Sequence, residues 1–345
     1  MTERATSEPR TTVADFTERE LIARISRQLP PSPAWMPIGI GDDAAVVEPE
    51  RNRLEVLSVD ALVEGIHFDR AFTPPRAIGH RALAVNLSDL AAMGAEPRLC
   101  LLSFVLPASL AVDDFDATIA GVAALAERHR VHVAGGNLSR SPGPMMLDVT
   151  VAGTAKRRQL LTRTGAQPGD ELYVTGTVGA AAAGLAMLQN DARSADDETN
   201  ACVARYLYPD PRIRMGLLVA RNRAATAGMD LSDGLADAVH QIAAASGVGA
   251  VIEADSIPLE PGARDWFSRQ GHDPVVSAIT GGDDYELLLA VHPRRGRRLN
   301  AARRHGQVGL TRIGFCTENP AVLLNCGSGA DAGAQPLPAG FHHFR

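Results

Sequence analysis

The chain has 345 residues, 45% of them apolar and 21% charged, with 34 Lys and Arg against 40 Asp and Glu. This length is more than one ordinary domain needs and suits two, and the composition is that of a chain that folds around apolar cores. The net charge of −6 and the 4% of aromatic residues argue against a general nucleic-acid binder, which needs a basic surface and rings for base stacking.

Membrane insertion and export are not expected either. No apolar run reaches the roughly 20 residues of a membrane helix, and the polar first residues lack the apolar centre of a signal peptide. The four cysteines, Cys100, Cys202, Cys316 and Cys326, stand singly, so we expect free thiols rather than disulfides or a zinc knuckle. The sequence therefore predicts a cytoplasmic protein that binds neither nucleic acid nor membranes.

Apolar spacing and turn residues predict the elements of the first half. Residues 1–15 are polar and are expected to form a flexible tail. The elements expected after this tail are, in chain order, a helix from about Phe16 to before Pro30, a strand at 54–59, a helix at 78–93 ended by Gly94, a strand at 99–106, a helix at 113–130 and a strand near 147–151.

The sequence changes character after Gly153. Residues 156–170 are basic and rich in turn-forming residues, so we expect two domains, 16–155 and 156–345. The expected elements of the second are a strand from Tyr173, a helix at 180–188, a solvated loop at 190–200, helices near 211–227 and 233–246, and strands at 249–253 and 286–291. The basic stretch 292–305 is interpreted as a solvated helix face. The alternation of strands and helices predicts an α/β or α+β class with mixed sheets.

The strongest chemical signal is a set of acidic residues in glycine- or serine-containing turns near strand ends. They are Asp42, Asp43, Asp60, Asp89, Asp230, Asp233, Asp283, Asp284 and Glu286. A single such residue usually just forms a turn. If several converge, their carboxylates repel one another unless a cation neutralises them. Oxygen ligands without a Cys or His cluster favour Mg²⁺ or Mn²⁺ over zinc, and such a site suits phosphoryl transfer.

Other nucleotide-binding motifs match less well. No GxxxxGK[ST] loop and no protein-kinase motif set occurs. Residues 39–44 (GIGDDA) fit GxGxxA, but two aspartates would stand where a pyrophosphate binds, which is unfavourable without metal. Residues 134–141 (AGGNLSRS) could admit a phosphate or could be an ordinary loop between strands. Arg163 could reach a nucleotide or lie on the surface, and His67 could donate to a phosphate or be structural.

On these residues the chain resembles the thiamine-monophosphate kinase family of the aminoimidazole-ribonucleotide-synthetase superfamily, from about Phe16 to Phe344. The segments that carry the resemblance are GIGDDAAVV, LSVD, VEGIHF, RALAVNLSDLAAMGAEP, AGGNLSRS, LTRTGAQPGDELYVTG, MDLSDGL, GGDDYELLL and GFHHF. The resemblance implies a two-domain fold whose N-terminal domain dimerises and forms a barrel across the interface. It also implies an ATP-dependent kinase that converts thiamine monophosphate to thiamine diphosphate by direct in-line transfer.

The resemblance also implies a role for individual residues. The positions of the family's magnesium ligands are Asp43, Ser58, Asp60, Asp89, Asn137, Asp230 and Asp233. The ATP-contacting positions are Gly136, Asn137, Arg163 and Ser232, and the substrate-contacting positions are His67, Asp283 and Phe341, the last as a ring that could stack on thiamine. Several Mg²⁺ ions, ATP as co-substrate and a homodimer follow from the same resemblance.

Three positions depart from the family pattern. Val59 replaces a usual Thr, Asn137 a usual Asp, and Asp283 a usual Glu. The first two changes would remove a hydroxyl and a charge near the metal positions, and the third shortens a substrate-contacting side chain by one methylene. Two alternatives to the kinase therefore stay open. One is a divergent member that phosphorylates or activates another small substrate, and the other is a protein that binds nucleotide or thiamine phosphate without turnover.

Overall fold

The computed structural model of the chain describes residues 11–190, 201–327 and 333–341. Contacts divide the chain into two compact units, which we describe separately. Unit 1 comprises residues 1–49, 59–83 and 99–150, and unit 2 comprises residues 50–58, 84–98 and 151–345. The predicted domains 16–155 and 156–345, with a boundary at 156–170, remain a prediction. The two units are not the same division, since helix α2 and strands β1, β2 and β4 each contribute residues to both. The loop predicted at 190–200 falls almost entirely outside the described residues.

The elements of the first half follow the predicted order, with one further strand. They are η1 (Val13–Asp15), α1 (Glu18–Arg27), β1 (Leu54–Val63), α2 (Pro75–Ala92), β2 (Glu96–Pro107), α3 (Val112–His129), β3 (His132–Ser141) and β4 (Met146–Ala155). The tail predicted over residues 1–15 is too long, since Val13 is buried and its N–H donates to the Leu110 carbonyl at 2.9 Å. A buried apolar side chain ties down that part of the chain.

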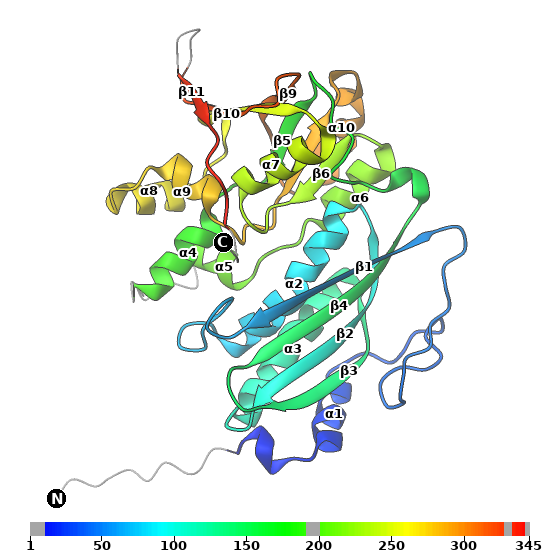
Figure 1. Ribbon diagram of the computed structural model, residues 1–345. Coiled ribbons are helices and arrows are strands. Elements are labelled where there is room, and N and C mark those ends of the chain that lie inside the picture. The colour runs from blue at the N-terminus through cyan, green and yellow to red at the C-terminus, as the bar shows by residue number, and fades with distance from the viewer. Residues whose placement is uncertain (1–10, 191–200, 328–332, 342–345) are drawn as a thin grey trace, which may run out of the picture. The chain divides into compact units, whose positions relative to one another are not determined.

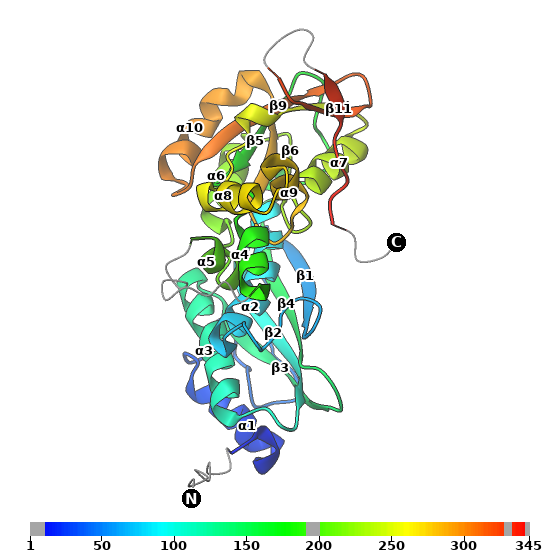
Figure 2. The same ribbon diagram turned by 90° about the vertical axis from the view of Figure 1, so that its left-hand side faces the viewer.

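Helices α2 and α3 lie on one face of the four-stranded sheet (Figures 1 and 2). Two glycines let their backbones approach closely. A Cβ atom on Gly79 would lie 1.8 Å from the Thr118 carbonyl oxygen, and one on Gly121 would lie 2.0 Å from that of Arg76. Larger residues at these two positions would force the helices apart, and with them the sheet residues that α2 covers.

The sheet has the strand order β1-β4-β2-β3, and β3 pairs in parallel with β2. Residues 134–141, for which the sequence left a phosphate loop and an ordinary loop open, are instead part of strand β3, so both alternatives are wrong about the secondary structure. Gly136 explains this strand in spite of its polar sequence. A Cβ atom there would lie 1.9 Å from the Leu102 carbonyl oxygen of β2, so only glycine permits this approach.

The second half forms a seven-stranded sheet of order β11-β10-β7-β9-β5-β8-β6, flanked by helices. Its elements are η2 (Arg157–Gln159), β5 (Glu171–Thr175), α4 (Ala180–Gln189), α5 (Ala201–Leu207), α6 (Ile213–Asn222), β6 (Ala227–Asp230), α7 (Leu235–Ser246), β7 (Gly249–Glu253), η3 (Ala254–Ser256), α8 (Pro261–Arg269), α9 (Pro274–Thr280), β8 (Leu287–Val291), η4 (Pro293–Arg295), α10 (Gly296–His305), β9 (Leu310–Thr317), β10 (Val322–Asn325) and β11 (Ala334–Pro336). The mixed sheets and helices confirm the α/β or α+β class.

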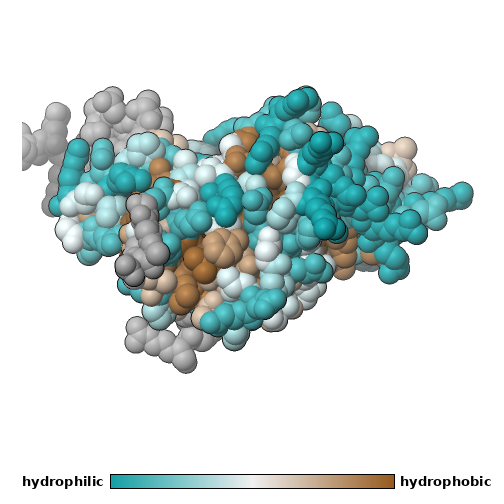
Figure 3. Space-filling view, turned by 90° about the horizontal axis from the view of Figure 1, so that it is seen from above, coloured by the Kyte–Doolittle hydropathy of each residue, from teal (hydrophilic) through white to brown (hydrophobic). Residues whose placement is uncertain are grey.

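Two features of this half differ from the prediction. The helix expected over 211–227 ends at Asn222, because Arg223 adopts a left-handed backbone and β6 begins four residues later. The short helices α5, α8 and α9 and the strands β6 and β9–β11 were not predicted. The interpretation of the basic stretch as a solvated helix face is confirmed, because it forms α10, which buries Leu299 and Ala302 and exposes its arginines. Seen from above, the surface is largely hydrophilic with smaller hydrophobic areas (Figure 3).

The predicted free thiols are confirmed. All four cysteines are unbonded, and Cys326 alone among them is exposed. Over the part of the chain that the structure describes, no helix combines the length and the apolar character needed to cross a bilayer.

Candidate active site

The last turn of α2 carries Asp89, the first of the predicted metal-binding acids. The Ser58 hydroxyl on β1 donates a hydrogen bond to its carboxylate. Burial raises the pKa of Asp89, while the Ser58 hydrogen bond and the positive charge of Arg163 act in the opposite direction. Two predicted metal-binding residues and one predicted ATP-contacting residue therefore lie near one another in unit 2.

A second contact in unit 2 joins the same helix to strand β6. The Ser88 hydroxyl donates to the Asp230 carboxylate at 2.6 Å, with Ser88 fully buried and Asp230 almost so. The sequence reasoning missed Ser88. Its place immediately before Asp89 in NLSDL was the available signal, since neighbouring helix residues can reach different partners.

The turn that carries Ser232 and Asp233 pairs by its backbone with the segment 281–286. The Asp283 N–H donates to the Ser232 carbonyl at 2.8 Å, and the Leu231 N–H donates to the Glu286 carbonyl at 2.8 Å. The Phe341 N–H in turn donates to the Asp233 carbonyl at 3.2 Å, and its side chain is 51% exposed. Backbone hydrogen bonds thus join the three segments that carry these predicted metal, ATP and substrate positions.

Arg163 is exposed, in the segment that follows η2. Its guanidinium donates to the Gln241 side-chain oxygen at 2.6 Å, and Gln241 donates to the Asp237 carboxylate at 2.5 Å. Both partners lie on α7, the helix that begins directly after Asp233 and Gly234. The arginine is therefore fixed from the helix that follows the acidic turn, and remains exposed to solvent.

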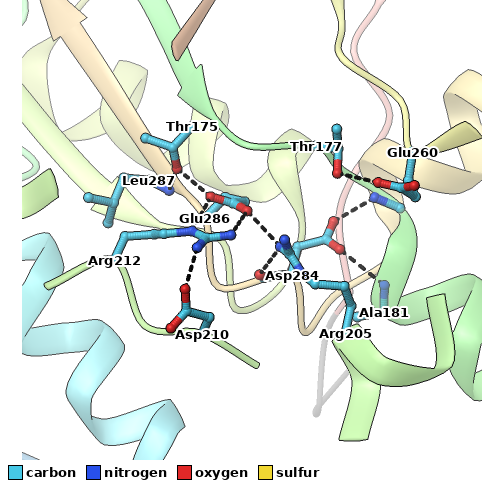
Figure 4. Close-up of polar contacts among 11 residues, drawn as sticks. Thr175, Thr177, Ala181, Arg205, Asp210, Arg212, Glu260, Asp284, Glu286 and Leu287 are labelled. Carbon is cyan, nitrogen blue, oxygen red and sulfur yellow. Dashed lines mark hydrogen bonds and ion pairs between the residues drawn. The ribbon is translucent and has the colours of Figure 1, made fainter. Parts of the chain in front are cut away.

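Asp284 and Glu286, within the segment 281–286, belong to a different and buried set of polar contacts (Figure 4). Glu286, which is fully buried, accepts from Arg212 Nε at 2.7 Å, from Arg205 at 2.6 Å and from the Thr175 hydroxyl at 2.5 Å. Two arginines therefore neutralise a carboxylate that the sequence reasoning grouped with the possible metal ligands, so that grouping is wrong for Glu286.

The Asp284 carboxylate also has its hydrogen-bond partners within the protein. Its carboxylate accepts from the Gly179 and Ala181 N–H groups at 2.6 and 3.2 Å, at the start of α4, where the helix dipole favours a negative charge. Burial nevertheless raises its pKa to about 7, with the two backbone hydrogen bonds acting in the opposite direction. Asp284 therefore anchors the segment to α4.

Five of the predicted site residues lie in unit 1, namely Asp43, Asp60, His67, Gly136 and Asn137. His67 is half-buried, and its Nδ1 accepts from the Val63 N–H at 3.0 Å, which leaves the proton of a neutral ring on Nε2. Asp60 lies on β1, two residues after Ser58 and thus on the same strand face. Asp43 is exposed in a turn, where its N–H donates to Asp42 at 2.8 Å.

Asn137 lies on the other edge of the same sheet from Asp60. Two strands separate β1 from β3, so their backbones are about 14 Å apart at a spacing of roughly 4.8 Å per strand. Asp60 and Asn137 therefore cannot ligate one ion within a single chain. The Asn137 amide donates to the Ser139 hydroxyl at 2.9 Å, and both residues are exposed.

The departure at position 59 lies on the opposite face of its strand. Ser58 and Asp60 share one face of β1, and Val59 alternates to the other, where it is 55% exposed. Within one chain, the missing hydroxyl is therefore not beside Ser58 and Asp60, contrary to the expectation from the sequence. The departures at Asn137 and Asp283 remain at predicted site positions.

The predicted metal-binding side chains in unit 2 offer only oxygen atoms, from Ser58, Asp89, Asp230 and Asp233. This set fits Mg²⁺, which prefers carboxylate, hydroxyl and water oxygens. Within the described residues, no group of three or more His, Cys, Asp or Glu is placed to hold a metal unaided.

Comparison with known families defines the class of protein. Residues 41–155 match the description "AIR synthase related protein, N-terminal domain", and residues 167–324 match "AIR synthase related protein, C-terminal domain". The two matches cover most of the chain, so the fold is a two-domain fold of the AIR synthase type.

Individual relatives narrow this class. The thiamine-monophosphate kinase of Synechococcus elongatus is 40% identical over 310 residues, 88% of this chain and 91% of that protein. The crystal structure of the Stenotrophomonas maltophilia enzyme is 35% identical, with a TM-score of 0.79, over 95% of this chain and all of that one. AaThiL complexed with AMPPCP and TMP is 30% identical, with a TM-score of 0.74, over 99% of this chain and all of that one. The chain belongs to the thiamine-monophosphate kinase family.

Proposed function

We propose that this protein transfers the γ-phosphoryl group of ATP to thiamine monophosphate and so produces thiamine diphosphate and ADP. The observation that carries the proposal is the match over nearly the whole chain to a relative complexed with AMPPCP, an ATP analogue, and TMP. The oxygen-only set of side chains, Ser58, Asp89, Asp230 and Asp233, supports it, because phosphoryl transfer needs positioning and charge neutralisation more than covalent chemistry by the protein.

In the proposed reaction, an oxygen of the thiamine monophosphate phosphate attacks the γ-phosphorus of ATP. The new P–O bond forms in line with the bond between the γ-phosphorus and the β,γ-bridging oxygen. That second bond breaks, and the bridging oxygen leaves as part of ADP. The attacking phosphate is already anionic at neutral pH, so no strong base is required. No side chain is assigned as a nucleophile or as an acid or base, and ADP and thiamine diphosphate form in equal amounts.

Magnesium is part of this proposal. We assign its protein ligands to Asp43, Ser58, Asp60, Asp89, Asn137, Asp230 and Asp233, with Asn137 serving a different ion from Asp60. Bound Mg²⁺ would offset the negative charge of the ATP phosphates and of the transferring group. Ser58 and Ser88 hold the Asp89 and Asp230 carboxylates in place by hydrogen bonds, which reduces the reorganisation needed when an ion binds.

The substrates have separate proposed contacts. ATP is assigned to Gly136, Asn137, Arg163 and Ser232, and thiamine monophosphate to His67, Asp283 and Phe341. The Nε2–H of His67 can donate to a phosphate oxygen, and the exposed ring of Phe341 can stack on a thiamine ring. Asp283 offers a carboxylate to which the Tyr285 hydroxyl already donates at 2.9 Å.

We further propose that the protein is a homodimer whose four-stranded sheets form a barrel across the interface. The support is a set of exposed apolar side chains on strands β1, β2 and β4 of this sheet. They are Leu57, Val59, Leu101 and Met146, which are 71%, 55%, 39% and 37% exposed. Exposed apolar side chains are commonly covered at interfaces. The proposed location is the cytoplasm, because ATP is the co-substrate and the cysteines are unpaired.

The decisive experiment is an assay of the purified protein with ATP, Mg²⁺ and thiamine monophosphate, with the thiamine phosphates separated by chromatography. Equal amounts of thiamine diphosphate and ADP are expected. ADP formation with another acceptor but none with thiamine monophosphate would favour the divergent enzyme. ATP binding without transfer to any acceptor would favour the protein that binds without turnover.

A further inference from the structure

The segment 281–286 combines an unusual backbone with buried side chains. Asp283 and Tyr285 have positive φ angles of 68° and 50°, a left-handed conformation that residues other than glycine disfavour. Asp284, Tyr285 and Glu286 are all buried. Such a backbone persists only where its surroundings hold it, and the contacts in Figure 4 show what holds this one.

The buried side of the segment is bound at several points. Arg205 donates both to the Asp284 carbonyl at 3.1 Å and to the Glu286 carboxylate at 2.6 Å, so it binds the backbone and a side chain of the segment. Arg212 binds both Glu286 oxygens and also donates to Asp210 at 2.7 Å. The cavity for the Glu286 carboxylate depends on Gly176, where a Cβ atom would lie 2.1 Å from Glu286 Oε1.

The other side of the segment is bound to the acidic turn. The Asp283 and Tyr285 N–H groups donate to the carbonyls of Ser232 and Leu231, and the Glu286 carbonyl accepts from the Leu231 N–H. Leu231 and Ser232 directly follow Asp230 in the sequence. A displacement of Glu286 would therefore reach both Asp283 and the turn that carries Asp230 and Asp233.

We infer that Arg205, Arg212 and Glu286 form a positioning clamp that sets the place of Asp283 and of the Asp230–Asp233 turn. None of the three is assigned to substrate or metal, and the clamp acts through backbone. The inference rests on the proposed function, because Asp283 is assigned there to thiamine monophosphate. It predicts that weakening the clamp impairs substrate recognition in protein that is still folded.

The test uses two mild variants of the full-length protein, Glu286→Gln and Arg212→Lys. Glu286→Gln keeps the size of the side chain and removes its charge, and Arg212→Lys keeps the charge and removes the two-pronged guanidinium. The matched control is Arg312→Lys, because Arg312 pairs with Glu253 at 2.8 Å between β9 and β7, in the same sheet but outside the clamp. Thermal unfolding fixes an assay temperature at which all proteins are folded.

We expect Glu286→Gln to raise the KM for thiamine monophosphate about tenfold, and Arg212→Lys to raise it by a smaller factor, since small misplacements of a substrate-contacting group carry large kinetic costs. The control should keep the wild-type KM. A purely structural role would instead lower the amount of active enzyme, so that the apparent kcat falls while the KM for thiamine monophosphate stays constant. That pattern would overturn the inference.

Hydrogen exchange gives a second result that does not depend on activity. In both clamp variants, peptides covering 229–233 and 281–287 should exchange faster than in the wild type, while peptides from β7 and β9 keep their protection. Unchanged exchange in the first two peptides would contradict the clamp even if the kinetics changed. If the wild-type protein does not phosphorylate thiamine monophosphate, the proposed function fails, and the exchange result alone decides whether the clamp exists.

Discussion

Unit 2 contains two groups of acidic residues that resemble one another in the sequence and differ in their surroundings. Asp284 and Glu286 are buried, and their carboxylates are bound by helix N–H groups, by a hydroxyl and by arginines. Asp89 is only partly buried and accepts from a serine hydroxyl, and Asp233 lies partly exposed in a turn. The first group is neutralised by the protein, whereas the second is suited to a cation supplied from solution.

This difference separates structural acids from ligand acids more clearly than any motif does. When a buried carboxylate loses an arginine partner, its charge is left uncompensated and the protein becomes less stable. Removal of an acid that binds a catalytic metal ion mainly lowers the rate of catalysis. Mutation of the first group should therefore lower stability and, through the clamp, raise the substrate KM, whereas mutation of the second should mainly lower turnover.

The largest effect is expected from Asp89→Asn and Asp233→Asn. Each removes a charge proposed to hold Mg²⁺, and turnover should fall by about 10²–10³-fold or more, as in other sites that lose one electrostatic contact. Unfolding midpoints should stay near that of the wild type. Asp113→Asn, an exposed acid in the first turn of α3, is the control. Near-normal turnover in both test variants would remove these residues from the metal site.

Arg212→Met should produce the opposite response. It leaves the buried Glu286 carboxylate without one of its two arginines, and the loss of one partner of a buried ion pair typically costs about 3–5 kcal/mol. Urea unfolding followed by circular dichroism measures the change in the free energy of unfolding. The exposed pair of Arg53 and Glu96 supplies a comparison, since Glu96→Gln should cost less than about 1 kcal/mol. Equal costs for both variants would mean that burial does not distinguish the two pairs.

The acids of the two groups also differ in how far the sequence could reveal them. The motifs NLSDL, MDLSDGL and GGDDYEL correctly marked segments that lie together in unit 2. They could not show that Glu286 is bound to Arg212, 74 residues away, or that Ser88 reaches Asp230 across 142 residues. Such pairs depend on how the helices pack against the sheet, which local spacing does not specify.

The same limit explains the errors in secondary structure. Strands rich in β-branched residues, such as 249–253, were predicted because their side chains suit a pleated surface. The segment GGNLSRS lacks that pattern, and it becomes part of β3 because Gly136 allows β2 to approach. Tertiary contact decided this strand, so a single sequence could not reveal it.

The raised pKa of Asp284 gives a prediction for stability against pH. Its pKa is about 7 in the folded protein and near 3.8 when unfolded, so the folded state keeps a proton between these values that the unfolded chain loses. The contribution of Asp284 to the free energy of unfolding is therefore greatest below pH 4 and falls as pH rises to about 7, by up to about 1.4 kcal/mol per pH unit.

Asp284→Asn removes this titration. Urea unfolding at pH 5, 6, 7 and 8 should show the wild type losing stability relative to the variant up to about pH 7, after which the two curves run parallel. Two curves that stay parallel over the whole range would mean that Asp284 has the same pKa in both states. The comparison between variants cancels the titration of all other groups to first order.

The smallest effect is expected at position 137, where this chain has an amide in place of the usual carboxylate. Asn137→Asp restores a charge on an exposed strand edge, so the Mg²⁺ concentration for half-maximal rate should fall by a few-fold if the side chain faces an ion. The Ser139 hydroxyl, which now accepts from Asn137, can donate to the new carboxylate, so the local hydrogen bond survives. Ser139→Ala is the control, since it removes that bond without adding charge. An unchanged Mg²⁺ dependence would place position 137 away from the metals and leave Asp43, Asp60, Asp89, Asp230 and Asp233 as the acidic ligands.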